Sequence, residues 1–374
     1  GNKVATTGAG ITVGPDATVD SNVVNALALG AAGGVATVGA TTARGTDGIV
    51  VDAGDFTVQS GHVRITGNRV HDRSGTGISL RTAVQTLLVK ENVVSRVGAG
   101  ILIENDGGAE HASVDNNEVL DVEATREGAN SAVGIGLMHA GSVTAAGNVV
   151  ARVGIDLQNA ILRAGIFVLT SQDVRVTGNV VDGVGPPGGY LGLSVGLAVF
   201  GPFAAASVSD NSSRFSADQP APSEGVWIAL LVETVAQALG VGNEVTALPA
   251  HDGVLVLTGV NAYLAAAAPE HVGLASNSLS GGGNDPTCLV RIAGELVAQG
   301  NQCEHVGGDS PVAMDLTASA ITASTNRARG TRARIVLHVD GKRFAALGNL
   351  APGGTHLGSS PLPAPWAPLN PTVP

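Results

Sequence analysis

The chain is poor in aromatic residues, in cysteine and in charge. Its 374 residues include two Trp, two Tyr, six Phe and two Cys, and only 14% are charged. Two cysteines exclude a small scaffold held together by disulfides. Positive charge is also scarce, with 20 Lys and Arg against 31 Asp and Glu, which argues against a nucleic-acid-binding protein, because such a protein needs a basic face for phosphate. Apolar residues (44%) and glycine (53 residues) are plentiful, so the chain is not intrinsically disordered.

Targeting and membrane signals are weak. No charged segment followed by an apolar core opens the chain, so no signal peptide is visible. Residues 184–209 carry no charge and are long enough to span a bilayer. They contain Pro186, Pro187 and Pro202, however, and they keep the repeat described next, so we predict buried strands and no membrane insertion.

A short phrase recurs along the sequence: alternating apolar residues, a turn, an asparagine and a further apolar residue. It reads VRITGNRV around Asn68, LLVKENVV around Asn92 and VRVTGNVV around Asn179, with equally clear copies at Asn117 and Asn148. Weaker copies follow at intervals of 23 to 34 residues, and Asn22 is a candidate earlier copy. The weaker copies are centred on Asn211, Asn243, Asn277, Asn301, Asn326 and Asn349.

A second phrase lies between the asparagines and consists of glycine followed by alternating apolar residues. It appears after Gly77, Gly100, Gly134, Gly165, Gly196, Gly225 and Gly253. Short alternating runs rich in Val and Ile and bounded by Gly are typical of strands. Two or three such strands in about 23 residues leave no room for a crossover helix, so each strand must pair with its counterpart in the next repeat. The sequence therefore predicts an all-β parallel solenoid of 11–12 coils with capped ends.

The recurring asparagine places one amide at the same bend of every coil, where it can bond to the next one along. This pattern resembles the right-handed parallel β-helix family, the pectate-lyase-like superfamily with its asparagine ladder formed here by Asn68, Asn92, Asn117, Asn148 and Asn179. We expect an N-terminal cap or first coils over residues 1–45, the β-helix over 46–350 and a Pro-rich cap or tail over 351–374. Within the first segment, residues 22–32 suggest a short capping helix, and Trp366 is expected to plug the last coil.

The outward positions of the glycine-phrase strands are mostly apolar in the middle coils. An apolar strip of this kind on the outside of a protein marks an interface. The insertions that lengthen the middle repeats all fall between the asparagine and glycine phrases, and they form one flank of loops. We expect the strip to be covered by these loops or by a partner chain. Its predicted interface residues are Leu102, Met138, Phe167, Leu169, Phe200, Trp227, Leu255 and Leu257.

Polar candidates gather near the N-terminal coils. Arg81, Glu104 and Asp106 are weak catalytic candidates, offering two carboxylates and a base one coil away. Lys90, Glu91, Glu110, His111 and Asp115 belong to the same region, which a solvated turn explains equally well. No metal site and no cofactor are predicted, because the sequence has no P-loop, GxSxG, CxxC or HExxH pattern.

Two further sets of residues have structural explanations. Acid and base alternate coil by coil just after the asparagines, which favours a ladder of ion pairs over an active groove. This set is Asp72, Arg96, Asp121, Arg152, Asp182 and Arg214. Cys288 and Cys303 fall at inward positions, where they act as small core residues near enough to pair, and their redox state is left open.

Two functional hypotheses follow. The first is a non-catalytic structural or binding module of a bacterial surface, secreted or phage-like assembly, which associates through the apolar strip as a homo-oligomer, for example a trimer, or within a larger assembly. The second is a carbohydrate-active enzyme (a polysaccharide lyase, hydrolase or epimerase) with a polysaccharide as its partner. An extracellular or particle-borne location suits both. Fold alone does not choose between them.

Overall fold

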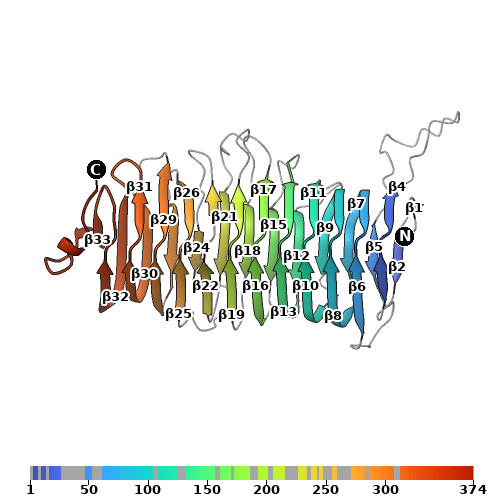
Figure 1. The fold of residues 1–374 in the computed structure, drawn as a ribbon, viewed down its shortest axis with the longest axis horizontal. Coiled ribbons are helices and arrows are strands. Elements are labelled where there is room, and N and C mark those ends of the chain that lie inside the picture. Colours follow the sequence, from blue (N-terminus) through green and yellow to red (C-terminus); the bar gives the residue numbers. More distant parts are fainter. Residues whose placement is uncertain are drawn as a thin grey trace.

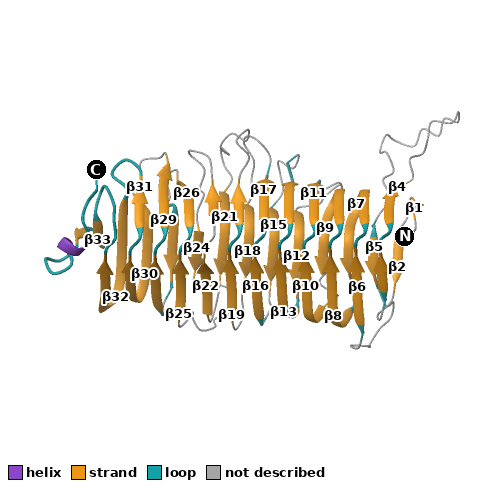
Figure 2. Cartoon of the chain, in the orientation of Figure 1, coloured by secondary structure: helices purple, strands orange, loops and turns teal. Residues whose placement is uncertain are grey.

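The structure is a computed structural model of the whole chain. It describes residues 3–6, 10–13, 17–26, 47–52, 61–103, 108–123, 131–155, 161–169, 172–185, 193–200, 205–214, 226–233, 237–241, 244–246, 255–258, 271–282, 286–292, 294–306 and 312–373. The chain winds into a rod of stacked coils, with the first strands at one end and the last at the other (Figure 1). Figure 2 shows that strands and the short bends between them build almost all of it.

Each coil contributes to three parallel sheets. Sheet A carries the residues before the asparagines, sheet B those after them, and sheet C the glycine phrase; the long strands β7, β9, β30 and β32 bend from one sheet into another. Sheet A contains β3 (Thr18–Asp20), β6 (His62–Thr66), β8 (Ala83–Lys90), β10 (Gly108–Asp115), β13 (Ala140–Ala146), β16 (Asp173–Thr177), β19 (Ala205–Ser209), β22 (Gln237–Val241), β25 (His271–Ala275), β28 (Glu295–Gln299) and the second halves of β30 (Val312–Ser324) and β32 (Arg334–Leu347).

Sheet B contains β1 (Lys3–Thr6), β4 (Val23–Ala26), the first halves of β7 (Arg69–Leu80) and β9 (Val93–Ile103), β11 (Glu118–Val122), β14 (Val149–Val153), β17 (Val180–Val184), β20 (Ser212–Arg214), β23 (Glu244–Thr246), β26 (Ser278–Gly282), β29 (Gln302–Val306) and β31 (Arg327–Arg329). Sheet C contains β2 (Ile11–Val13), β5 (Ile49–Val51), the remaining halves of β7, β9, β30 and β32, β12 (Ser131–Met138), β15 (Leu162–Leu169), β18 (Leu193–Phe200), β21 (Val226–Glu233), β24 (Leu255–Thr258), β27 (Cys288–Arg291) and β33 (Thr355–Leu357). These strands therefore confirm the parallel β-helix that the repeat predicts.

The bend between sheets A and B explains the asparagine phrase. The residue before each described asparagine from Asn22 to Asn349 has a left-handed backbone, for example Gly67 (φ 64°), Asn116 (φ 53°) and Gly147 (φ 64°). Glycine and asparagine adopt this conformation at low cost, which is why GN and NN recur at the bend. Glu91 (φ 57°) and Thr325 (φ 54°) adopt it against their intrinsic preference, so stacking of the coils imposes the bend there.

The asparagines form a continuous hydrogen-bonded ladder inside that bend. The Nδ2 of Asn92 donates to Asn117 Oδ1 at 3.0 Å, and the backbone N–H of Asn92 donates to the same oxygen. Asn117 repeats both bonds with Asn148, and Asn148 repeats them with Asn179. The side chains are at most 1% exposed, so the ladder satisfies amides that water cannot reach. The five predicted ladder residues are confirmed.

The ladder extends beyond the five clearest copies. Asn22 bonds to Asn68, which confirms the candidate early copy, and Asn179 bonds to Asn211. A second described run links Asn277 to Asn301, Asn326 and Asn349. It continues to Asn370, which the sequence analysis missed because that asparagine lies in the Pro-rich tail. Asn243 lies outside the described residues.

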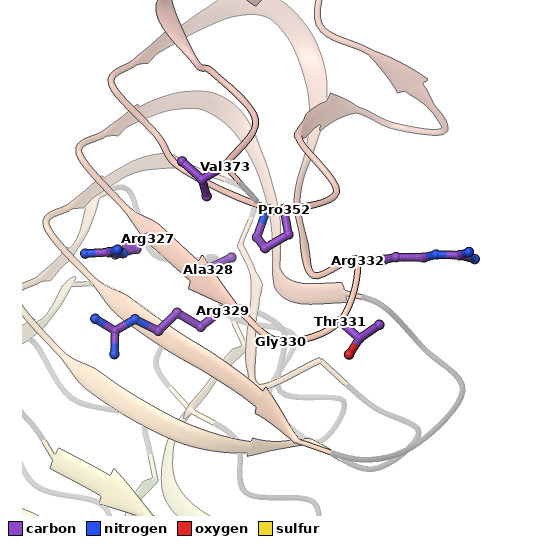
Figure 3. A pocket seen from close by; sticks show the side chains of 8 residues that line it. All are labelled: Arg327, Ala328, Arg329, Gly330, Thr331, Arg332, Pro352 and Val373. Atoms are coloured by element: carbon purple, nitrogen blue, oxygen red, sulfur yellow. The ribbon is translucent and has the colours of Figure 1, made fainter.

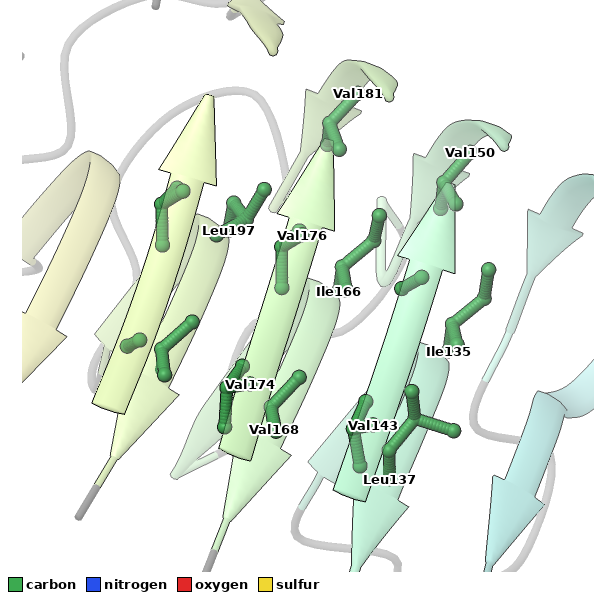
Figure 4. Close-up of a cluster of buried hydrophobic side chains, with 14 of the residues drawn as sticks. Ile135, Leu137, Val143, Val150, Ile166, Val168, Val174, Val176, Val181 and Leu197 are labelled. Carbon is green, nitrogen blue, oxygen red and sulfur yellow. The ribbon is translucent and has the colours of Figure 1, made fainter. Parts of the chain in front are cut away.

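The core lies between the three sheets and is filled by aliphatic columns. In the middle coils an isoleucine or leucine from sheet C meets valines from sheets A and B, as Figure 4 shows for Ile135, Val143 and Val150 and for the next coil. The glycine of the second phrase is explained by the same packing. A Cβ on Gly134 would lie 2.4 Å from Val150 Cγ1, and one on Gly165 would lie 2.4 Å from Val181 Cγ1. Glycine is therefore required where sheet C turns past the valine column.

Sheet C departs from the predicted register in its middle coils. Leu230 of β21 pairs with Leu197, and Leu255 of β24 pairs with Leu230, so the backbone of Leu255 is in register with the buried Leu197 rather than with Ala198. Leu257 likewise lies in the column of Val199, and Trp227 pairs with Ser194 outside the predicted strip. The register predicted for β24 is therefore shifted by one residue and that for β21 by four, and a one-residue slip moves a side chain to the opposite face. The register predicted for these three residues was wrong; their side chains lie outside the described set, so their part in an interface stays a prediction.

The two ends differ from expectation in part. Residues 23–26 form strand β4, so the capping helix predicted over 22–32 does not begin there; residues 27–46 lie outside the described residues. At the other end β33 pairs antiparallel with β34 (Ser360–Pro361), and the short 3-10 helix η1 (Ala367–Leu369) follows. Trp366 packs against Phe344 with ring centroids 5.5 Å apart, on the edge of the core. In the described part of the chain, no helix has the length and apolar character needed to span a membrane.

The two cysteines lie in the core of the same coil. Cys288 is fully buried and Cys303 is 1% exposed, and both are free thiols. A hydrogen bond to Cys288 and burial together raise the pKa of the Cys303 thiol well above its ordinary value. Both cysteines are therefore core residues, as the sequence predicts, and their thiols lie in contact.

The asparagine ladder can be tested with two neighbouring residues. In Asn117→Ala, the acceptor for two donors of Asn92 is lost and the donor to Val89 O and Asn148 Oδ1 is removed. We expect the free energy of unfolding to fall by about 3 kcal/mol or more, since each buried polar group left unpaired costs ~1–3 kcal/mol. Asn116→Gly is the control, because Asn116 is exposed and glycine tolerates its positive φ. Urea denaturation that gives similar stabilities for both variants would contradict the ladder's contribution.

Candidate functional site

The catalytic candidate Arg81 is engaged in a structural contact. Its Nη2 lies 3.0 Å from Asp47 Oδ2, and Asp47 is buried. The other carboxylate oxygen of Asp47 accepts the backbone N–H of Thr76, and its carbonyl accepts the buried guanidinium of Arg73. Asp47 therefore ties the first coils together, and Arg81 is part of that connection. Glu104 and Asp106 lie outside the described residues.

A shallow pocket of about 300 Å³ lies at the corner between sheets C and A. Glu110 on β10 and His139 at the bend before β13 supply its ionisable groups. Gly141 permits the close approach, since a Cβ there would lie 2.8 Å from Glu110 O. The remaining lining residues are Ala83, Val84, Gly108 and Ala109. The sequence analysis named Glu110 but missed His139, whose only signal is its place between two strands.

Hydroxyl and imidazole groups alternate along the outer face of sheet A beside this pocket. His62 Nδ1 lies 2.6 Å from Thr86 Oγ1, and His111 Nδ1 lies 2.6 Å from Ser142 Oγ. The four residues occupy one column, because β6, β8, β10 and β13 pair in register. The contacts join neighbouring coils, so His111 stabilises the stacking next to Glu110, which lines the pocket.

The outer face of sheet C carries the predicted apolar strip in modified form. Leu102, Met138, Phe167, Leu169 and Phe200 are all half-buried and lie on β9, β12, β15 and β18. Beneath the two phenylalanines lies a second hydrophobic cluster, separate from the main core. Its members Ala164, Val195 and Ala198 are fully buried, with Leu162, Phe167 and Phe200 packed against them. The Phe rings are 5.3 Å apart and tilted.

The same face becomes polar in the C-terminal coils. Asp315 occupies the outward column of Ala198, and its Oδ1 lies 3.3 Å from His338 Nε2. Burial raises the pKa of Asp315, against the opposing effect of His338 and Arg291. The sequence analysis missed Asp315 and His338. It assumed a wrong register for β21 and β24 and therefore could not identify the residues that continue the column of Ala198 into the C-terminal coils.

The alternating charges form two stacked ion pairs. Arg96 donates from Nε and Nη2 to the two oxygens of Asp72 at 2.6 and 2.8 Å, and Arg152 binds both oxygens of Asp121 in the same way. All four have positive φ, so they mark the second bend of each coil. Hydrogen bonds from the arginines lower the pKa of Asp72 and of Asp121. The ladder is thus confirmed for these four residues.

The pattern does not extend unchanged to the next coil. Gly183 occupies the bend position there, and Asp182 precedes it and pairs in register with Arg214 of β20, whose side chain is outside the described set. Within the described ranges, no group of three or more His, Cys, Asp or Glu side chains is placed to hold a metal ion.

This geometry defines a class of protein: a parallel β-helix with one asparagine ladder, a charged ladder beside it and an apolar outer strip. The comparison with family models agrees. The model described as "Right handed beta helix region" matches residues 2–150 and 60–213, more than half of the chain. The chain therefore belongs to the right-handed β-helix family. A search of curated proteins and a search of solved structures give no match.

The charged ladder predicts a pH-dependent stability contribution. Arg96 keeps the pKa of Asp72 below its usual 3.8, so the pair contributes fully above that value and its contribution is lost as the pH falls below about 4. Because both side chains are more than a third exposed, we expect Arg96→Gln to cost only about 0.2–1 kcal/mol at pH 7. The difference from wild type should shrink between pH 4 and pH 2 in urea denaturation. Arg175→Gln, which alters an exposed arginine on sheet A, is the control and should show no such pH dependence.

Proposed function

We propose that the protein is a non-catalytic structural or binding module that associates through the outer face of sheet C. The observation that carries the proposal is the second hydrophobic cluster, which is separate from the main core and against which the half-buried Phe167 and Phe200 pack. Together with Leu102, Met138 and Leu169 these rings give a rigid apolar strip along four coils. Contiguous apolar surface of this kind favours protein–protein contact.

The occupant we propose is a second copy of the chain, in a homo-oligomer that belongs to a secreted, surface or particle-borne assembly. Strands hold the strip rigidly, so little conformational entropy is lost when it is buried. The ionisable groups support a structural function, since Asp72, Arg96, Asp121 and Arg152 join coils and their shifted pKa values keep them charged. Fixed charges of this kind stabilise stacking and do not exchange protons near neutral pH.

Light scattering after size exclusion tests this interface. We expect the wild type to form an oligomer and Met138→Glu/Leu169→Glu to shift it to the monomer, because two carboxylates would have to be buried at the contact. Val297→Glu provides the control: Val297 is 47% exposed on β28, in sheet A, and should leave the oligomer intact. A monomeric wild type at micromolar concentration would contradict the proposal.

A carbohydrate-active enzyme is the second candidate, and the corner pocket favours it. Glu110 and His139 both line that space of about 300 Å³. A carboxylate and an imidazole at one pocket are the groups that general acid–base chemistry uses. On this alternative, Glu110 and His139 would both contact the sugar.

Activity screening separates the two candidates. Under the enzyme hypothesis, purified protein cleaves at least one member of a panel of neutral and acidic polysaccharides, and Glu110→Gln lowers the rate by about a hundredfold or more. Asp315→Asn removes a carboxylate on another sheet and should retain the rate. A panel with no cleavage, or a fully active Glu110→Gln, would exclude the pocket as the catalytic site.

A further inference from the structure

The C-terminal end of the rod is basic, although the chain as a whole carries a net charge of −11. Residues 312–373 contain six Lys and Arg against two acidic residues, a local net charge of +4. Four of the arginines fall within eight residues: Arg327, Arg329, Arg332 and Arg334. Neither the apolar strip nor the corner pocket accounts for this concentration of charge.

The strand geometry places two of these arginines side by side. Ala328 is 1% exposed and fills the core, so its neighbours Arg327 and Arg329 on β31 both point outward. Figure 3 shows their side chains extending to the same side of the strand, with Arg332 on the opposite rim. Along a strand, residues two apart are about 6.6 Å apart, a separation that lets two guanidinium groups bind one oxyanion between them.

The arginines are held on a rigid frame. Gly330 (φ 116°) ends the strand where a Cβ would lie 2.4 Å from His305 O, so the turn packs directly on the coil below. Pro352 and Val373, from the last coil and the tail, close the other side of an open pocket of about 770 Å³. The rest of the lining is Ala328, Thr331 and the backbone of Gly330.

The four guanidinium groups are exposed, and the described part of the chain gives none of them an ion pair. Arg329 has one acidic neighbour in register, Glu304 of β29, and Arg327 has the neutral Gln302. A fork of two arginines prefers oxyanions with several acceptor oxygens, such as phosphate and sulfate esters. No aromatic ring lines the pocket, so a nucleic-acid base would have nothing to stack on.

We propose that this pocket is a binding site for sulfate or phosphate ester groups carried on a polysaccharide. Arg327 and Arg329 bind the ester directly, and Arg332 and Arg334 add positive potential around it. The acidic remainder of the rod repels the polymer, so contact is confined to this end. The site is independent of the apolar strip on sheet C.

Titration calorimetry in 50 mM salt tests the site, with dextran sulfate as the probe and neutral dextran as its uncharged counterpart. We expect dextran sulfate alone to bind, with an affinity that falls as salt rises. Arg327→Gln/Arg329→Gln should weaken binding about tenfold or more and flatten the salt dependence. Arg69→Gln/Arg175→Gln is the matched control, since it removes the same charge from exposed positions elsewhere and should bind as the wild type does.

Several outcomes would overturn the proposal. They are equal binding by the two double variants, equal binding of neutral dextran, or binding of single-stranded oligothymidine as tight as that of dextran sulfate. A wild type whose oligomer dissociates in salt, together with a monomeric Arg327→Gln/Arg329→Gln that still binds dextran sulfate, would assign the arginines to an interface between copies. Met138→Glu/Leu169→Glu should leave polymer binding unchanged, which separates this result from the test of the apolar strip.

Discussion

The need to satisfy a buried amide at every turn governs this molecule. Each asparagine accepts two hydrogen bonds from the coil before and donates to the coil after, so no coil can slip without breaking several bonds in water-free surroundings. This fixes the register of sheets A and B. The valine column and the glycine that makes room for it then fix sheet C. Outward residues of successive coils consequently lie in columns that run along the rod. Each surface feature of the rod is therefore formed by residues of one column or of neighbouring columns.

The columns divide the surface by chemistry. Sheet A is polar beside the corner pocket, where His111 and Ser142 bond between coils. Sheet C is apolar in the middle, where Phe167 and Phe200 cover a small cluster of their own, and polar near Asp315 and His338. The bend after the asparagines is a line of opposite charges. One scaffold therefore presents an apolar face, a polar face and a basic end.

The sequence was informative where a residue's identity determines its position. An asparagine at the bend and a valine two residues later occur together in every clear repeat and mark the position of the bend. The ladder and much of the core could therefore be predicted. The strand register of Leu255 and Leu257 could not be predicted, because glycine was the only marker of register in the coils that the insertions lengthen. An error of one residue in that register assigns a side chain to the opposite face of the sheet. The contacts of Asp47 with Arg73 and Arg81 join residues more than 25 positions apart that carry no pattern. The Glu110–His139 pocket likewise depends on how two neighbouring coils meet.

The bond from Asn349 to Asn370 changes how the end of the chain should be regarded. Asn370 also donates to Ala346 O and Trp366 O, which draws the proline-rich segment back over the final coil. That segment is therefore hydrogen-bonded to the last coil and covers it. Shortening the polypeptide to residue 350 for expression would uncover two amide donors of Asn349 and the indole-covered edge of Phe344, and it would leave a template onto which foreign strands could add.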